Sequence, residues 1–173
     1  MLHHIKIASE EDVPALAQIS RDTFCENFAH LYSPEDLGGY LGTAFSEEKL
    51  REEMAGDKTM FLIAYTPADE PAGYAKACPC RIPVDWLNES SGEVQRLYVD
   101  KAHQGSGLGR KLFEECLQYL KEEGFPEIYL GVWQKNLKAQ QFYKSYGFEV
   151  TGEYKFKVGN HYDDEFVMKL TLP

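Results

Sequence analysis

Three glycines alternate with other residues where a predicted strand gives way to a predicted helix. The segment Gln104-Gly105-Ser106-Gly107-Leu108-Gly109 separates an apolar run ending at Val99 from an amphipathic stretch that stops at Gly124. Glycine lets the backbone approach a ligand closely and take positive φ. The free N–H groups of a helix's first turn favour phosphate. The spacing therefore predicts an anion site, and a flexible turn is the plainer alternative.

Two common phosphate-binding motifs do not fit this loop. The Walker motif needs G-x-x-x-x-G-K-[ST], and the dinucleotide fingerprint needs G-x-G-x-x-G, whereas the spacing here is G-x-G-x-G. The loop does match Q-x-x-G-x-G through Gln104, Gly107 and Gly109. In this respect it resembles the pyrophosphate loop of the GNAT acetyltransferases, which bind acetyl-coenzyme A (acetyl-CoA).

A second motif strengthens the resemblance. The stretch from Asn136 to Phe148 agrees with the GNAT signature N-x-x-A-x-x-F-Y-x-x-x-G-F at every specified position. It follows the glycine loop in the expected order, and the resemblance covers roughly Lys58 to Leu172. A narrower resemblance, to the PaiA-type spermine/spermidine N-acetyltransferases, rests on Glu93 to Val99, Leu130 to Trp133, and Val158 to Met168.

The resemblance implies an α/β (α+β) fold, with a mixed, mostly antiparallel sheet of about seven strands and helices on both faces. Its two central strands, 93–99 and 127–132, would splay apart and admit the pantetheine arm of acetyl-CoA along a free strand edge. Asn136 would reach the pantetheine while also capping its helix. Main-chain groups of Leu97, Tyr98 and Val99 would hold the arm, and main-chain N–H groups of Gln104, Gly105, Ser106, Gly107, Leu108 and Gly109 would hold the pyrophosphate.

The implied reaction moves an acetyl group from a thioester to an amine. Tyr143 is the candidate general acid at the sulfur, because a phenol pKa near ~10 and a thiol pKa near ~8.5 permit proton transfer to the leaving thiolate. Its alternative role is core packing beside Phe142. Glu93 heads the central strand and could take the amine's proton, or it could be an ordinary surface carboxylate. A backbone N–H of residues 97–99 would polarise the acetyl carbonyl.

The implied acceptor is a small cationic amine, and the narrower resemblance favours spermidine or spermine. Aromatic faces and carboxylates could bind it. The aromatic segment from Phe28 to Phe45 fits either helix packing or an acceptor wall. Trp86 and Asp163-Asp164-Glu165 are also available to bind it, although a solvated turn is the more ordinary interpretation of the acidic triplet. A protein N-terminal or lysine acceptor, and a non-catalytic acetyl-CoA-binding regulatory module, both stay open as alternatives.

Composition narrows the class of partner. The net charge is −10, from 28 acidic and 18 basic residues, which disfavours nucleic acid and anionic membranes. No apolar run approaches the ~20 residues of a membrane span, and Met1-Leu2-His3-His4 leads directly into a strand pattern without a secretory signal. Cys78-Pro79-Cys80 is too tight for common zinc spacings, and Cys116 lies on an apolar helix face. We expect a cytoplasmic protein without a metal, monomeric or homodimeric.

The remaining elements follow from local patterns. Because 173 residues fit one core, we expect a single GNAT domain over 1–173. Ser9 opens a capping box before a helical stripe that reaches Phe24, and Ser33 and Ser46 begin two shorter helices. Gly159-Asn160 marks a hairpin. Besides the two central strands, strands are predicted over 4–8, 59–65, 73–77, 148–156 and 166–172.

Overall fold

The computed structural model describes residues 3–88 and 90–173; Met1 and Leu2, at the chain start assessed above for a secretory signal, lie outside this range, as does Glu89. A seven-stranded sheet runs through the molecule in the order β1-β2-β3-β4-β5-β7-β6. Its strands are β1 (His4–Ile7), β2 (Met60–Tyr65), β3 (Pro71–Pro79), β4 (Gly92–Val99), β5 (Glu127–Trp133), β6 (Glu149–Val158) and β7 (His161–Thr171).

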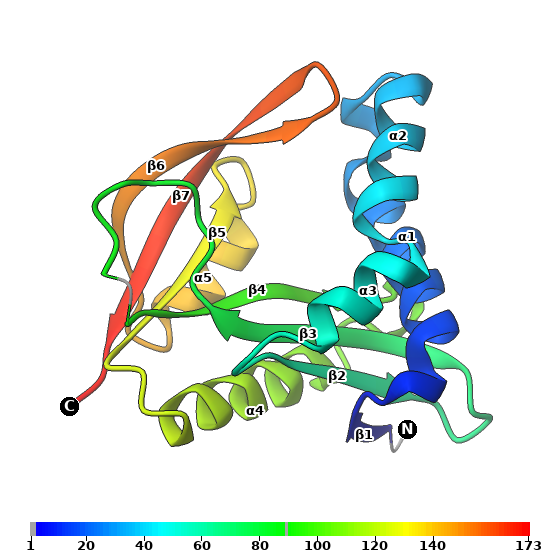
Figure 1. Cartoon of the computed structure of the whole chain (residues 1–173), viewed down its shortest axis with the longest axis horizontal. Coiled ribbons are helices and arrows are strands. Elements are labelled where there is room, and N and C mark those ends of the chain that lie inside the picture. Colours follow the sequence, from blue (N-terminus) through cyan, green and yellow to red (C-terminus); the bar gives the residue numbers. More distant parts are fainter. Residues whose placement is uncertain (1–2, 89) are drawn as a thin grey trace.

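Helices cover both faces of the sheet, as expected (Figure 1). One face packs on α4 (Leu108–Glu122) and α5 (Leu137–Lys144). The other packs on α1 (Val13–Phe28) and α3 (Glu47–Met54), and α2 (Pro34–Ala44) stands beyond α1. Short 3₁₀ turns, η1 (Glu10–Asp12), η2 (Ala29–Leu31) and η3 (Lys101–His103), join these elements.

The α4 helix shows how the apolar pattern places an element. Leu112, Phe113, Cys116 and Leu120 recur at helical spacing and are fully buried against the sheet. Cys116 is therefore a core residue, as its position on the apolar face predicted. Because α4 is fastened to the sheet along its whole length, its N-terminus is held at a fixed place beside the end of β4.

The sheet is split between β4 and β5. These two strands are parallel and pair only at Gly92 with Ile128 and at Glu93 with Tyr129, whereas every other neighbouring pair is antiparallel. Beyond Glu93 the strands diverge (Figure 1). The pairing of β3 with β4 also shifts register so that Gln95 has no partner residue, which marks a β-bulge. The splayed pair predicted from the sequence is confirmed.

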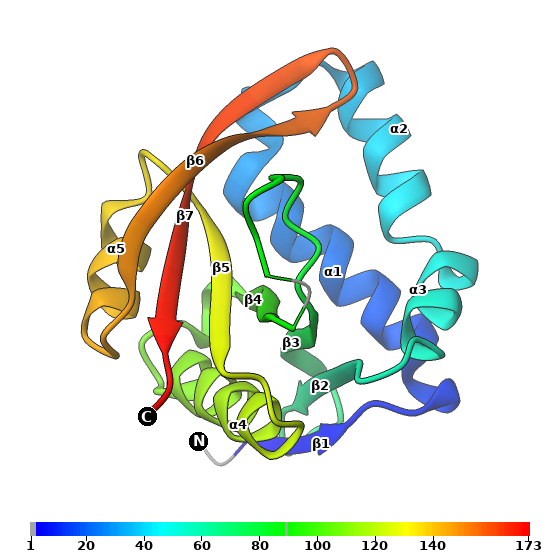
Figure 2. The same ribbon diagram turned by 60° about the vertical axis from the view of Figure 1, so that its left-hand side comes forward.

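The β6–β7 hairpin is longer than predicted. β7 begins at His161 rather than Phe166, so Asp163, Asp164 and Glu165 belong to a strand and not to a solvated turn. Because side chains alternate in a strand, Asp163 and Glu165 share one face while Asp164 lies on the other. The hairpin arches over the open side of the sheet and its tip reaches α2 (Figure 2). The other predicted elements differ from the observed ones by a few residues at their ends.

Candidate active site

The glycine loop connects β4 to α4 through a conformation that favours glycine. Gly105 and Gly107 have φ of 77° and 83°, a region that costs other residues strain. The side chain of Gln104 donates to the Val99 carbonyl at 3.1 Å, and Ser106 Oγ donates to the His103 carbonyl at 2.6 Å. The loop is thereby fastened to the end of β4 by its own side chains, while its backbone is left for a ligand.

The geometry of this loop fits an anionic ligand. A Cβ built on Gly105 or Gly107 would have nothing within 4 Å, so the backbone there is open to approach. Gly107 is the N-cap of the 15-residue helix α4, and a glycine has no side chain with which to occupy the first-turn N–H groups. Those groups and the positive end of the helix dipole suit a pyrophosphate.

The second motif positions α5 at the far side of the split. Asn136 is the N-cap of α5, and its Oδ1 accepts from the Ala139 N–H at 3.1 Å, so its predicted capping role is confirmed. Buried Gln140 donates to the carbonyls of Trp133 at 3.3 Å and Gln134 at 2.9 Å. These bonds fasten the first turns of α5 to the end of β5. The helix then presents Tyr143 to the space between the two diverging strands.

Tyr143 packs in the core and also lines the pocket. Its ring packs on Phe113 at 5.3 Å and on Phe148 at 6.2 Å, and the residue also lines the central pocket. Burial, together with the charge of Glu165, raises the pKa of the Tyr143 phenol above its usual value. The phenol therefore keeps its proton near neutral pH and can act as a donor.

A pocket of about 420 Å³ fills the split and extends toward the β6–β7 hairpin. Four of the predicted site residues line it, namely Glu93, Tyr98, Asn136 and Tyr143. Leu97 and Val99 instead pack against the main core, and the glycine loop lies at the end of β4 outside the pocket lining. The pocket thus gathers the predicted chemical groups, while the predicted cofactor-binding backbone lies beside it.

Glu93 is a buried carboxylate, so its interpretation as a surface residue is wrong. It is 4% exposed and stands where β4 and β5 part. Burial raises its pKa to about 7, although a 2.8 Å hydrogen bond from the Arg81 backbone N–H and the charges of Lys76 and Arg96 oppose the shift. A carboxyl that titrates near neutrality is suited to accept a proton from an amine.

The aromatic segment packs between short helices and also lines the pocket. Phe24, Phe28, Tyr32, Tyr40 and Phe45 form a cluster between α1, α2 and the hairpin, and all five line the pocket. Tyr32 donates to the Asp163 carboxylate at 2.5 Å, which ties this cluster to β7. The cluster is thus a packed wall with one side facing the pocket. Trp86, by contrast, packs on Tyr129 at 6.2 Å and is not among the pocket-lining residues.

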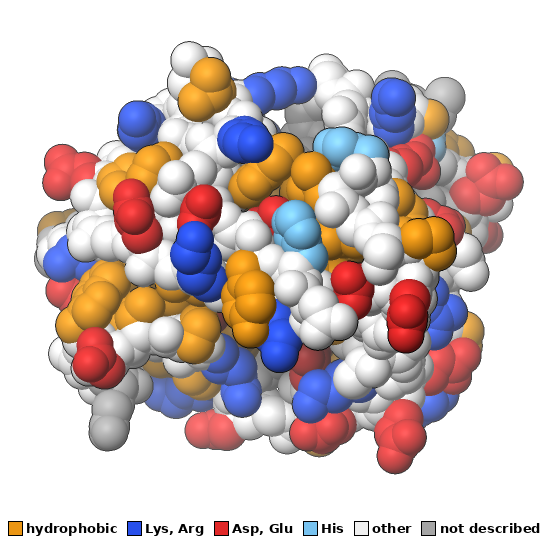
Figure 3. Space-filling model, turned by 90° about the horizontal axis from the view of Figure 1, so that it is seen from above, with side chains coloured by type: hydrophobic (Ala, Val, Ile, Leu, Met, Phe, Trp, Pro, Cys, Tyr) orange, Lys and Arg blue, Asp and Glu red, His pale blue; other side chains and the backbone are white. Residues whose placement is uncertain are grey.

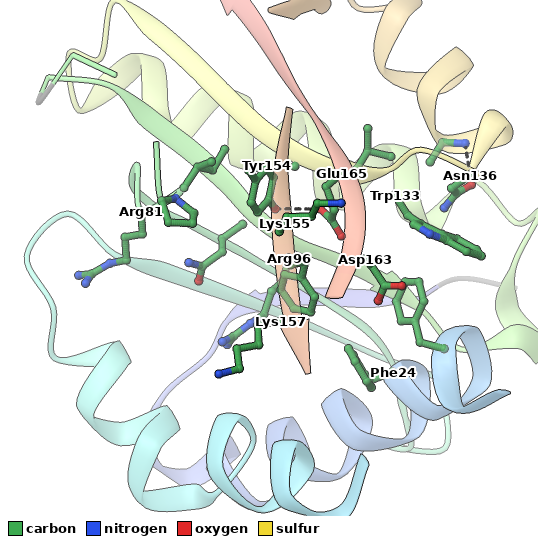
Figure 4. A pocket seen from close by; sticks show the side chains of 18 of the residues that line it. Phe24, Arg81, Arg96, Trp133, Asn136, Tyr154, Lys155, Lys157, Asp163 and Glu165 are labelled. Atoms are coloured by element: carbon green, nitrogen blue, oxygen red, sulfur yellow. Dashed lines mark hydrogen bonds between the residues drawn. The ribbon is translucent and has the colours of Figure 1, made fainter. Parts of the chain in front are cut away.

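The C-terminal hairpin contributes polar residues to the pocket, of which the sequence patterns indicated Asp163 and Glu165 but missed Tyr154. Tyr154 on β6 donates to Glu165 on β7 at 2.8 Å, and both line the pocket (Figure 4). Burial raises the pKa of Glu165 to about 7; the bond from Tyr154 opposes the shift, and the charges of Asp163 and Glu93 add to it. Strict alternation from His161 onward was the one available signal, because it would have placed Asp163 and Glu165 on the face shared with Val167.

Basic side chains also line the pocket. Arg96 is bound to Glu53 by two bonds of 2.8 and 3.2 Å. Lys155 pairs with Asp164 on the hairpin, while Arg81 and Lys157 are exposed. The face seen from above in Figure 3 carries acidic, basic and hydrophobic side chains interspersed. A charged ligand would therefore be selected by particular side chains rather than by one large field.

Within residues 3–88 and 90–173, no group of three or more His, Cys, Asp or Glu side chains could hold a metal ion. No helix in the same ranges is long and apolar enough to cross a membrane.

The class of acetyl-CoA-dependent N-acetyltransferases is defined by three features seen here. They are a split pair of parallel strands, a glycine loop at the N-terminus of a helix, and a capped helix that carries a tyrosine. The chain belongs to the Acetyltransferase (GNAT) family, whose model matches residues 15–148. It is an N-acetyltransferase that uses acetyl-CoA as its cosubstrate. The chain is 33% identical, over 95% of its length and 94% of the relative's, to an uncharacterized N-acetyltransferase in the pepI 3′ region of Lactobacillus delbrueckii subsp. lactis.

Two further comparisons concern Thermoplasma acidophilum. Its spermidine N(1)-acetyltransferase is 25% identical to this chain over 146 residues, which are 84% of this chain and 88% of the relative. The crystal structure of a PaiA N-acetyltransferase from the same organism, in complex with coenzyme A, superposes with a TM-score of 0.78 at 23% identity, covering 99% of this chain and 100% of the other. The predicted fold is thereby confirmed.

Proposed function

We propose that this enzyme acetylates a primary amine by direct attack in a ternary complex, with Glu93 as proton acceptor and Tyr143 as proton donor. The observation that supports it best is that one pocket receives a buried carboxyl from β4 and a protonated phenol from α5, on opposite sides of the split. Main-chain groups of Leu97, Tyr98 and Val99 and of residues 104–109 are proposed to hold acetyl-CoA.

The proton balance follows from the two residues. An alkyl ammonium has a pKa near ~10.4, so it must lose a proton before its nitrogen can attack. Glu93 takes that proton, directly or through water. The nitrogen then bonds to the acetyl carbon, the carbon–sulfur bond breaks, and Tyr143 supplies a proton to the sulfur. The second proton that the nitrogen loses in forming the neutral amide restores the Tyr143 phenol, and Glu93 releases its proton to water. The thioester is already activated, so the chain needs no nucleophile of its own.

The acceptor we propose first is a polyamine such as spermidine or spermine. The carboxylates of Glu93, Asp163 and Glu165 line the pocket and can pair with ammonium groups. Aromatic rings on its wall can add cation–π contacts. The name of the Thermoplasma relative, spermidine N(1)-acetyltransferase, supports the same acceptor.

A protein N-terminus or lysine is the second candidate acceptor. Arg81, Lys155 and Lys157 also line the pocket, and they favour an acceptor that carries acidic groups beside its amine, because a polycation would be repelled by them. We further propose that the enzyme works in the cytoplasm, where its four free cysteines would remain reduced.

A screen of acceptors with a free-thiol readout tests the proposal. The wild-type protein would be assayed with acetyl-CoA and, separately, spermidine, spermine, a small aminoglycoside and a peptide with an acidic N-terminal segment. Turnover highest with the polyamines supports the first candidate, and turnover highest with the peptide supports the second. Binding of acetyl-CoA with no turnover of any amine would contradict an enzymatic role and favour a regulatory module.

A further inference from the structure

A buried carboxylate, Glu93, and a half-buried one, Glu165, line the same pocket from different strands. Glu93 comes from β4 and Glu165 from β7, and β5 lies between these strands in the sheet. They are near enough that the charge of Glu93 raises the pKa of Glu165. The charge of Glu165 in turn raises the pKa of Tyr143. Glu165 is therefore coupled by charge to both residues proposed to transfer protons.

The position of Glu165 is built by its neighbours. Tyr154 Oη donates to Glu165 Oε2 at 2.8 Å, and Figure 4 shows the two side chains side by side. Gly131 on β5 makes room for them: a Cβ there would overlap the Tyr154 hydroxyl and come within 3.0 Å of Glu165 Oε2. Because Gly131 has no side chain, Tyr154 and Glu165 can lie directly against the backbone of β5.

Each of the two carboxylates accepts a hydrogen bond through one of its oxygens. Glu93 accepts the Arg81 N–H through Oε2, and Glu165 accepts Tyr154 through its own Oε2. Gln95, at the β-bulge, also lines the pocket. Its buried Oε1 has no hydrogen-bond partner among the described residues. The pocket therefore offers several acceptors to a ligand rich in N–H donors.

We propose that Glu165, positioned by Tyr154, is a specificity-determining residue that binds the reacting ammonium group of the acceptor opposite Glu93. This inference rests on the proposed function. An ammonium has three donors, which can be shared between the two carboxylates and the Gln95 oxygen. Glu93 then takes one proton from the bound ammonium, which becomes the neutral nucleophile, while Glu165 keeps the remaining donors oriented.

The surroundings of the two carboxylates determine how they titrate. The charged or titratable groups that act on Glu93 are Arg81, Lys76 and Arg96, and those that act on Glu165 are Tyr154, Asp163 and Glu93 itself. Because two neighbouring carboxylates cannot both ionise easily, we expect the pair to hold a proton until an ammonium replaces it. Amine binding should therefore release a proton near neutral pH.

The test uses two substitutions that should move the pH profile in opposite directions. Glu165→Gln removes a negative charge, so the acidic limb of kcat/KM should move to lower pH, and the KM for spermidine should rise at least tenfold with the KM for acetyl-CoA unchanged. Tyr154→Phe removes a bond that stabilises the ionised carboxylate, so the limb should move to higher pH. Glu165→Asp should restore part of the amine affinity.

Asp164→Asn is the matched control, because it removes the same charge from the adjacent hairpin residue, whose side chain is exposed and pairs with Lys155. It should leave the amine KM within twofold. The inference would be overturned if Glu165→Gln left the amine KM within twofold of the wild-type value. It would also be overturned if the acidic limbs of Glu165→Gln and Tyr154→Phe moved in the same direction. If Glu165→Gln does not fold, the test depends on Tyr154→Phe alone. An acidic limb of kcat/KM that does not move to higher pH in Tyr154→Phe would then overturn the inference.

Calorimetry separates this inference from the proposed function. Spermidine would be titrated into wild-type protein saturated with coenzyme A, in two buffers of different ionisation enthalpy. Binding with proton release, lost in Glu165→Gln, supports the inference even if no amine is turned over, which would sink only the proposed reaction. Binding that Glu165→Gln leaves unchanged, or no binding to the wild-type protein, overturns the inference.

Discussion

The carboxylate of Asp36, in the first turn of α2, accepts a 3.0 Å hydrogen bond from the backbone N–H of Asn160 at the tip of the β6–β7 hairpin. Gly159 beside it has φ of 57°, and any Cβ there would overlap the Asp36 side chain. Together with the Tyr32–Asp163 bond, this contact holds the hairpin against the helical wall. It thereby keeps the hairpin residues of the pocket facing α1 and α2.

Removing that contact should loosen the acceptor side of the pocket. Asp36→Ala is expected to lower the free energy of unfolding by about 1 kcal/mol and to raise the amine KM several-fold, with acetyl-CoA affinity unchanged. Chemical denaturation and steady-state kinetics measure both. Glu35→Ala removes a neighbouring, exposed charge from the same helical turn and should change neither KM. An equal effect of the two substitutions would contradict a role for the contact.

Tyr143→Phe should remove the proton donor while keeping the ring that packs on Phe113. General acid catalysis typically contributes about 10²–10⁴-fold, so kcat should fall by about that factor while acetyl-CoA still binds. Tyr146→Phe is the matched control, since its hydroxyl bonds to Glu114 at 2.7 Å. It should keep turnover near the wild-type rate. Unchanged turnover in Tyr143→Phe would remove Tyr143 from the role of acid.

The buried carboxyl of Glu93 should make the free energy of unfolding decrease as pH rises toward neutrality. The pKa of Glu93 is raised by burial from 4.5 to about 7, so between these values the folded protein binds more protons than the unfolded chain. Stability therefore falls as pH rises through that window, by an amount of order 3 kcal/mol for a shift of this size. Urea unfolding at pH 5 and pH 7.5 measures the difference.

Glu93→Gln should flatten this dependence, because glutamine does not titrate. The same residue should give kcat/KM an acidic limb near pH 7 in the wild-type enzyme, with activity rising as the carboxyl ionises. A wild-type stability that increases between pH 5 and pH 7.5, with Glu93→Gln showing the same slope, would show that the buried carboxyl is not the titrating group.

Gly107→Ala should weaken acetyl-CoA binding by straining the loop. Its φ of 83° costs a residue with a Cβ about 1–2 kcal/mol, and relaxing that strain would turn the first-turn N–H groups away from the ligand. Gly124→Ala is the matched control, because Gly124 follows the other end of α4 with φ of 84°. Both should lose similar stability, whereas only Gly107→Ala should raise the Kd for acetyl-CoA, measured by calorimetry.

Glu53→Gln should be strongly destabilising. Glu53 pairs with two buried cations, Lys76 at 2.9 Å and Arg96 at 2.8 Å. Breaking a buried ion pair from one side typically costs about 3–5 kcal/mol, because the remaining charge loses its partner. Glu52→Gln alters an exposed residue that pairs with Lys49 and should cost less than about 0.5 kcal/mol. Denaturant midpoints compare the two.

Local patterns predicted the parts of the site that lie within a few residues of one another. The glycine loop, the apolar face of α4 and the Asn136 cap each depend on contacts within one or two turns of chain. The family resemblance carried by the two motifs implied the splayed strands. The roles of Leu97, Tyr98 and Val99 and of the loop amides remain predictions.

The errors arose where a residue's environment depends on distant parts of the chain. Glu93 could be a surface residue by its type, but β3, β5 and the segment at Arg81 enclose it. The acidic triplet at 163–165 has the composition of a turn, yet pairing with β6 extends β7 through it. Burial by such pairing is a property of the sheet rather than of the segment.

The amino-acid sequence alone predicted the family, the cosubstrate and the two residues proposed to transfer protons, because the spacing of the motifs reflects local backbone geometry. Only the tertiary structure brought Glu165 and Tyr154 to Glu93, and Asp36 to Asn160, a pair 124 residues apart in the chain. The alternation of side chains along a strand predicts which of them share a face of the sheet. It does not predict which residues of other elements they contact. That depends on the order and twist of the strands in the assembled sheet.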